Sequence, residues 1–130
     1  MNAPNGMRTM LGRVRGLGSA KSGFAHWWAQ RMTALALVPL LLWFVISIIG
    51  LIGADHAAVA AWAGHPVSAV LLIALIIAVF HHAQLGLTVV IEDYVHEEVA
   101  KIVALAAVRG FAFLAGLIGV VSVLKLMVGK

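Results

Sequence analysis

The chain has 130 residues, of which 63% are hydrophobic and only 11% are charged, and its mean hydropathy is +1.06. Soluble domains carry about a quarter charged residues, so this composition excludes a soluble globular protein, a disordered tail and, despite a net charge of +4, a nucleic-acid binder. The absence of cysteine excludes disulfides, thiolate metal sites, iron–sulfur clusters and covalently attached c-type haem. We therefore predict an all-α integral membrane protein in which any redox centre is bound through other ligands.

Residues 1–31 form a basic N-terminal arm. An Arg-rich, acid-free segment that contains serine is also typical of a transit peptide, so processing of part of the arm stays open. A secretory signal is disfavoured, because the apolar stretch that follows is too long. We interpret the arm as a cytoplasmic segment that precedes a membrane domain at residues 32–130. Its charged residues are all positive: Arg8, Arg13, Arg15, Lys21 and Arg31.

Three long apolar stretches follow the arm. They cover residues 32–53, 66–91 and 102–124, and about 20 apolar residues are enough to cross the bilayer core as a helix. Pro66 suits the first turn of the second helix, because its missing N–H would be unpaired there anyway. Pro39 should kink the first helix. The sequence therefore predicts three transmembrane helices.

The distribution of Lys and Arg predicts the orientation of these helices, because positive residues accumulate on the cytoplasmic side of a membrane. The arm is basic, the loop at 54–65 has no Lys or Arg, and the next loop has Lys101 among four acids. We therefore place the N-terminus and the second loop in the cytoplasm or a mitochondrial matrix, and the first loop and C-terminus on the other side. Three of the four tryptophans lie at the expected interfaces: Trp27, Trp28 and Trp62.

The second stretch carries two adjacent histidines well inside the apolar region. His81 and His82 lie roughly 14 to 15 Å from Ile91 along a helix, and an ionisable residue at such a depth marks a functional site. Neutral imidazole is a good iron ligand. The alternative is a hydrogen bond to a neighbouring helix, and the residues by themselves leave both open. Adjacent helical residues point about 100° apart, so at most one of the pair should reach a given cofactor.

Polar residues at the cytoplasmic end of this stretch share a face with one of the histidines. Asp93 is eleven residues after His82, which is about 20° from a whole number of turns and roughly 16 Å along the axis, and Tyr94 follows it. A redox centre at mid-membrane with this pair at the interface suits electron transfer to a quinone. The simpler alternative is that the acid and the tyrosine only anchor the helix end.

Two arginines lie near or within the spans. Arg31 opens the first helix, where it either pairs with an anionic propionate or quinone oxygen or serves as an ordinary interfacial positive charge. Arg109 is the only charge in the third stretch, and its side chain can extend back to the cytoplasmic interface. The same stretch has small residues four apart, which allow close helix approach: Ala112 with Gly116, and Ala115 with Gly119.

Two blocks of this sequence resemble a known family. The run from His82 to Tyr94 contains an H-x10-D-Y pattern, and the N-terminal region reads G-R-V-R-G-L-G at 12–18 and H-W-W-A-Q-R at 26–31. Together with three spans and an inside N-terminus, these blocks resemble the succinate dehydrogenase hydrophobic membrane anchor, the D subunit of respiratory complex II, of alphaproteobacterial type.

The resemblance implies a role for four residues. His82 would be one axial ligand of the iron of a haem b, with a second histidine supplied by the partner membrane anchor, the C-type subunit. Tyr94 would hydrogen-bond a carbonyl oxygen of ubiquinone, and Asp93 would organise that pocket and its protons. Arg31 would lie near the haem propionates. The resemblance gives no role to the remaining candidates: His26, His81 and Arg109.

The same resemblance implies the partners and the location. Three helices would pack against the C-type anchor in the bacterial inner membrane, or alternatively the mitochondrial inner membrane. A flavoprotein subunit and an iron–sulfur subunit would dock on the cytoplasmic face and carry out succinate oxidation, so this chain would not be catalytic by itself. Two alternatives are a haem-free structural or assembly anchor and a small proton-coupled transporter. Transporters usually show repeated halves or broken helices, and neither is visible here.

Overall fold

The computed structural model describes Met10 and residues 21–129. Most of the predicted N-terminal arm therefore lies outside the described residues, including Arg8, Arg13, Arg15 and the block at 12–18. The last part of the arm, from Lys21 onwards, is helical.

Four helices make up the continuous described segment, and no strand occurs among the described residues. They are α2 (Lys21–Gly50), α3 (His56–Ala63), α4 (Pro66–Tyr94) and α5 (Glu98–Val128). The three long helices are each apolar and long enough to cross a membrane. The predicted all-α class with three membrane-spanning helices is therefore confirmed.

The helices do not begin and end where the apolar stretches do. α2 begins eleven residues before the first stretch and ends at Gly50, before the stretch ends, and α5 extends beyond the third stretch at both ends. Apolar length reports only the part of a helix suited to the bilayer core, whereas backbone hydrogen bonds continue into polar sequence. The first loop also contains α3, a helix that was not predicted from the sequence. Its N-cap Asp55 accepts a hydrogen bond from the Ala58 N–H at 2.9 Å.

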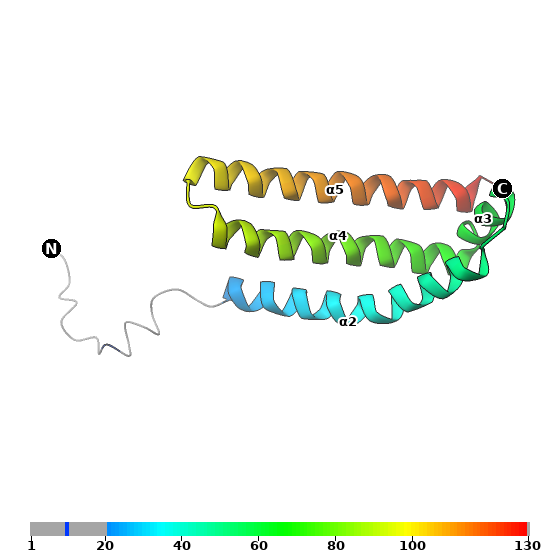
Figure 1. Ribbon diagram of the computed structural model, residues 1–130, viewed down its shortest axis with the longest axis horizontal. Helices are drawn as coiled ribbons and strands as arrows, with labels where there is room; N and C mark the ends of the chain where they lie inside the picture. The colour runs from blue at the N-terminus through cyan, green and yellow to red at the C-terminus, as the bar shows by residue number, and fades with distance from the viewer. Residues whose placement is uncertain (1–9, 11–20, 130) are drawn as a thin grey trace.

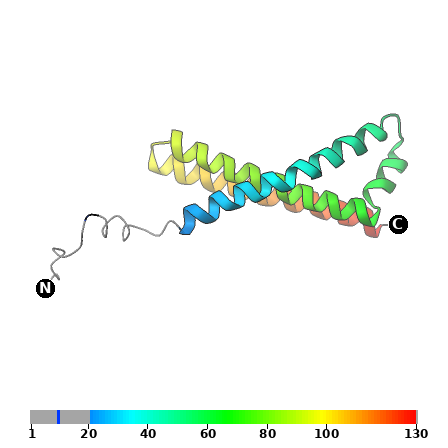
Figure 2. The same cartoon turned by 90° about the horizontal axis from the view of Figure 1, so that it is seen from below.

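α4 is the central helix of the molecule. It packs against α5 on one side and α2 on the other, and in the described part of the chain α2 makes no contact with α5. Figure 1 shows the three long helices side by side, and Figure 2 shows that α2 crosses the other two obliquely while α4 and α5 run along each other. α2 continues through Pro39 and bends in its second half (Figure 1). A site on either packed face of α4 is therefore shared with α2 or with α5.

The α4–α5 contact uses the small residues of α5. A Cβ on Gly119 would lie 3.2 Å from side-chain carbons of Ile76, and one on Gly116 would lie 3.7 Å from the ring of Phe80. Ala112 is buried in the same contact. The prediction that the small-residue spacing allows close helix approach is confirmed.

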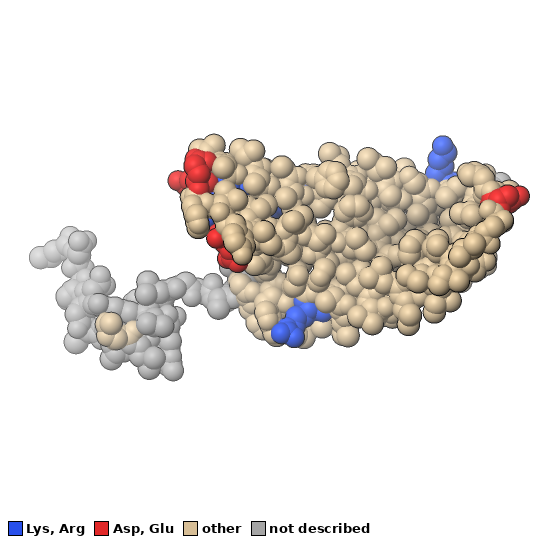
Figure 3. All heavy atoms as spheres, in the orientation of Figure 1, with Lys and Arg blue, Asp and Glu red and all other residues tan. Residues whose placement is uncertain are grey.

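The buried core is small. One cluster, built on Leu37, Leu75 and Ala78, joins α2 to α4. A second lies at the α3 end, where the rings of Trp43 and Trp62 stack with centroids 5.8 Å apart. On the face drawn in Figure 3, acidic atoms appear only at the two ends of the bundle and the surface between them is almost entirely uncharged. This outer surface suits lipid or another membrane helix, not water.

Candidate functional site

A groove of about 600 Å³ lies between α2 and α4, within the size range of cofactor and ligand sites. One wall is formed by α2 and the other by α4. In each wall the lining residues are mostly three or four positions apart, so they share one face of the helix. The groove brings together two of the predicted site residues, Arg31 and His82. Its lining is His26, Trp27, Gln30, Arg31 and Ala34 from α2, and His82, Gly86 and Val89 from α4.

His82 is half-buried in the α4 wall of this groove. Its Nδ1 lies 3.0 Å from the hydroxyl oxygen of Thr33 on α2. Among the described residues this is the one hydrogen bond that the ring makes, so Nε2 has no protein partner there. Imidazole with one nitrogen held and the other free is the arrangement that metal-binding histidines have.

Arg31 lies at the edge of the groove and is exposed. Its guanidinium carbon is 4.7 Å from the centroid of the Trp27 ring, a cation–π contact. The rings of Trp27, Trp28 and Phe24 are mutually stacked, with centroids 6.2 to 6.4 Å apart. This aromatic surface holds a positive charge beside the groove, where an anionic group of a ligand would be stabilised.

Two polar atoms on the α2 wall are buried without a hydrogen-bond partner among the described residues. They are His26 Nε2 and Gln30 Oε1, and their residues are one helical turn apart. An unpaired buried polar atom costs about 1–3 kcal/mol of stability. A bound molecule or a neighbouring subunit that supplies the missing hydrogen-bond partner would remove this cost. The groove therefore leaves room for a polar partner that the described residues do not provide.

Gly86 opens the α4 wall one turn after His82, on the same face. A Cβ built there would meet only Gln30 Nε2, at 3.8 Å. The absence of a side chain leaves the space beside His82 clear for a planar group.

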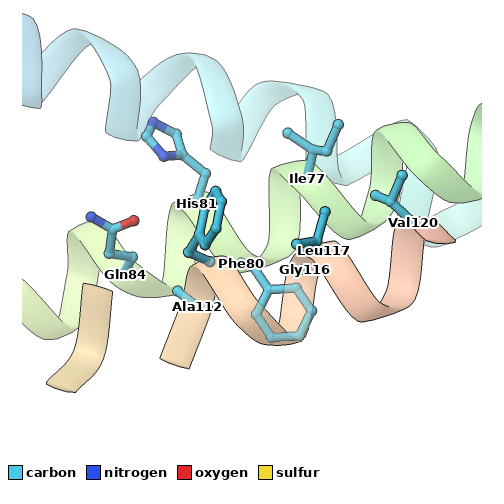
Figure 4. A pocket seen from close by; sticks show the side chains of 9 residues that line it. Ile77, Phe80, His81, Gln84, Ala112, Gly116, Leu117 and Val120 are labelled. Atoms are coloured by element: carbon cyan, nitrogen blue, oxygen red, sulfur yellow. The ribbon is translucent and has the colours of Figure 1, made fainter. Parts of the chain in front are cut away.

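His81 points to other cavities. It is exposed and lines a groove of about 290 Å³ between α4 and α5. Figure 4 shows this second groove, with His81 and Gln84 on α4 and Ala112 and Gly116 on α5. The adjacent histidines thus line different grooves, as their offset of about 100° requires.

Asp93 and Tyr94 are not part of the groove around His82. Both are exposed at the end of α4, and the tyrosine retains 79% of its accessible surface. Val89 is the last groove residue on α4, and Asp93 continues its helical face one turn further on. The Asp93 carboxylate therefore lies on the same helical face as His82, but both this carboxylate and the Tyr94 phenol are exposed.

The described residues contain no cluster of three or more His, Asp or Glu side chains that could hold a metal ion. His82, whose Nε2 has no partner among the described residues, can supply one nitrogen ligand to a metal that brings other ligands of its own.

Three residues at this site were not predicted from the sequence: Thr33, Gln30 and Gly86. A signal for the first two was present, because His26, Gln30 and Thr33 are spaced four and three residues apart and so form one polar stripe on an apolar helix. Gly86 had the matching signal on α4, four residues after His82. Arg109, which was given no role, is exposed on α5.

Comparison with known proteins identifies the family of the chain. Residues 5–122 match the family described as succinate dehydrogenase/fumarate reductase transmembrane subunit. The chain is 33% identical over 107 residues to a succinate dehydrogenase hydrophobic membrane anchor subunit of Rickettsia bellii, covering 82% of this chain and 86% of that protein. It is 30% identical over 95 residues to a succinate dehydrogenase membrane anchor subunit of Reclinomonas americana, covering 71% and 79%. No solved structure matches the chain.

Proposed function

Because the chain belongs to the succinate dehydrogenase/fumarate reductase transmembrane subunit family, we propose that it is the D-type membrane anchor of a succinate:quinone oxidoreductase. Three helices that are long and apolar enough to cross a membrane support the anchoring role. The chain has no cysteine for an iron–sulfur cluster. Succinate oxidation and the first electron transfers then belong to a flavoprotein subunit and an iron–sulfur subunit.

The groove between α2 and α4 is the site for a haem b. The observation that carries this proposal is that the groove brings His82, whose Nε2 has no partner among the described residues, together with the positive charge of Arg31. The residues fit the group, because Gly86 leaves space beside the imidazole and two buried polar atoms await a partner. When bound, the haem would supply a reversible one-electron carrier.

The two predicted site residues of the groove would then have separate tasks. His82 would hold the iron through its Nε2, and a histidine of the C-type anchor would supply a second ligand. Arg31, steadied over the Trp27 ring at 4.7 Å, offsets the negative charge of the propionates. The iron needs only one ligand from this chain, in agreement with the single imidazole on the α4 wall.

Asp93 and Tyr94 form this chain's part of a ubiquinone site. The phenol O–H donates to a quinone carbonyl oxygen, and the carboxylate organises the polar surroundings through which protons arrive. The 79% exposure of the tyrosine supports a pocket whose other walls come from partner subunits. Asp93 lies on the helical face of His82, about 16 Å along the axis.

The arm at residues 1–31 and the α4–α5 loop face the cytoplasm in this proposal, with α3 and the C-terminus on the opposite side. The family relationship and the three apolar helices support a membrane location, which we assign to the bacterial inner membrane or, alternatively, the mitochondrial inner membrane. The C-type anchor covers part of the apolar surface, and the soluble subunits dock on the cytoplasmic face.

The test is a pair of neighbouring substitutions in the complex purified from its native membrane. We expect His82→Ala to remove the b-type signal from the dithionite-reduced minus oxidised spectrum while the partner subunits still co-purify. His81→Ala is the matched control, because this histidine lines other grooves, and it should retain the signal.

A spectrum unchanged by His82→Ala would refute the ligand role. A wild-type complex with its partners but without haem would favour the haem-free anchor. A chain that purifies with neither haem nor partners would favour the transporter alternative.

A further inference from the structure

The hydroxyl of Thr33 makes three close contacts at the α2–α4 interface. Its oxygen is 2.7 Å from the carbonyl oxygen of Ala29, 3.0 Å from that of Gln30, and 3.0 Å from Nδ1 of His82. Thr33 and His82 are both half-buried. The contact therefore joins two helices at the imidazole that the proposed function assigns to the haem iron.

Proton accounting decides which group donates in this contact. A hydroxyl has one hydrogen and two lone pairs, and 2.7 Å is the usual separation of an O–H···O hydrogen bond. Two oxygens at that distance would repel each other if no hydrogen lay between them. The Thr33 hydrogen therefore points to the backbone carbonyls of its own helix, as a helical threonine commonly arranges.

The histidine must then be the donor toward Thr33. With its hydrogen committed, Thr33 offers only a lone pair, so Nδ1 of His82 carries the proton, and 3.0 Å is typical of an N–H···O hydrogen bond. In a neutral imidazole the other nitrogen then bears the lone pair. That nitrogen is Nε2, the one without a protein partner among the described residues.

We propose that Thr33 is a positioning residue that holds His82 in the Nδ1-protonated tautomer and orients the ring so that Nε2 is its ligand atom. This inference rests on the proposed function and deepens it. Metal-binding histidines generally donate their second N–H to an acceptor, which fixes the ring and makes it a stronger ligand. Here the acceptor is the Thr33 hydroxyl oxygen. Because this hydroxyl donates its own hydrogen to a backbone carbonyl, its oxygen accepts a stronger hydrogen bond from His82.

The experiment compares Thr33→Val with Thr33→Ser in the complex purified from its native membrane. Valine has nearly the shape of threonine but accepts no hydrogen bond, whereas serine keeps the hydroxyl. We expect the valine variant to lose haem to excess apomyoglobin more readily, with about 10- to 100-fold weaker binding. We also expect its haem midpoint potential to be more positive, because a less basic imidazole stabilises ferric iron less. The serine variant should return both quantities toward wild type.

Thr88→Val is the matched control. Thr88 is a buried threonine of α4 whose hydroxyl donates to the Gln84 carbonyl at 2.8 Å in the same back-bonded geometry, without a histidine contact. Haem retention and midpoint potential should not change in this variant.

The outcomes separate this inference from the proposed function. If wild type holds haem and His82→Ala loses it, while Thr33→Val matches wild type in retention and potential, the inference is overturned and the proposed function stands. Serine and valine variants that are equally impaired would also overturn it, because the hydroxyl would then not be the cause. If Thr33→Val and Thr33→Ala fail to assemble while Thr33→Ser assembles, the hydroxyl serves helix packing and the proposal is wrong. A haem that persists in His82→Ala overturns both.

Discussion

Polar side chains meet at one place in an otherwise apolar helix pair. His26, Gln30 and Thr33 form a stripe on α2, and His82 faces that stripe from α4. In a membrane each unpaired polar group is costly, because no water replaces a missing partner. Thr33 satisfies His82 within the chain, whereas His26 and Gln30 keep buried atoms without a partner among the described residues. This residual cost supports the proposal that a bound group completes the groove.

Gly86 tests whether the groove must stay open. We expect Gly86→Leu to weaken haem binding, because the added side chain occupies the space beside His82. The protein itself can accept a Cβ at this position, since that atom would meet only Gln30 Nε2, at 3.8 Å. Overpacking typically costs about 1–3 kcal/mol, which corresponds to about 5- to 150-fold in affinity. The measurement is haem per assembled complex. Gly110→Leu is the control, because a Cβ on Gly110 has no atom within 4 Å. Full haem content in Gly86→Leu would contradict the proposed site.

Among the elements, the short helix α3 ties the far end of the bundle together. It contacts both α4 and α5, and Trp62 on α3 stacks on Trp43 of α2 at 5.8 Å. Its C-cap Gly64 lies against the backbone of α5, where a Cβ would come within 2.5 Å of the Leu126 carbonyl oxygen. The glycine is needed for close approach and not for its backbone angles, because its φ of -85° is open to any residue.

Gly64→Ala should therefore destabilise the bundle through steric overlap alone. A backbone oxygen cannot move aside as a flexible side chain would, so we expect a loss of about 1–3 kcal/mol and a lower thermal midpoint of the purified complex. Gly50→Ala, at the end of α2, meets no atom within 4 Å and should leave the midpoint close to wild type. Equal midpoints for the two variants would show that α3 does not dock on α5 as described.

As a whole molecule, the bundle is incomplete by itself. α2 and α5 touch α4 but not each other in the described part of the chain, so α4 is covered on two sides only and few side chains are buried. The broad uncharged surface in Figure 3 is suited to lipid and to another membrane subunit. The proposed haem site has the same incompleteness, because this chain supplies only one of the two histidines proposed to hold the iron.

The natural absence of cysteine makes the proposed orientation directly measurable. We expect Ala57→Cys, on α3, to react with a membrane-impermeant maleimide added to the outside of intact cells. His96→Cys, in the α4–α5 loop, should react only after the membrane is opened, because that loop lies on the cytoplasmic side. Both residues are exposed, so accessibility within the fold is matched. The reverse labelling pattern would invert the topology and place Asp93 and Tyr94 on the outer side.

Features that depend on local order along the chain could be predicted from the sequence. Apolar length predicts three membrane helices, and helical periodicity places His82 on one face with Gly86, Val89 and Asp93. The same periodicity separates His81 from His82. The helix ends were less predictable, because polar sequence at an interface supports a helix as well as a loop, and this is why α2 begins at Lys21 and not at residue 32.

Which helix faces meet is visible only in the tertiary structure. Nothing in the spacing of the residues indicates that α2 crosses α4 at Thr33 and His82, or that α2 stays away from α5 in the described part of the chain. That Arg31 and His82 lie at one groove was indicated only by the family resemblance. In a soluble protein the apolar stripe of a helix reveals its inner face. In a membrane helix every face is apolar, because lipid is as apolar as the protein interior, so packing of shapes and pairing of a few polar groups decide the contacts instead.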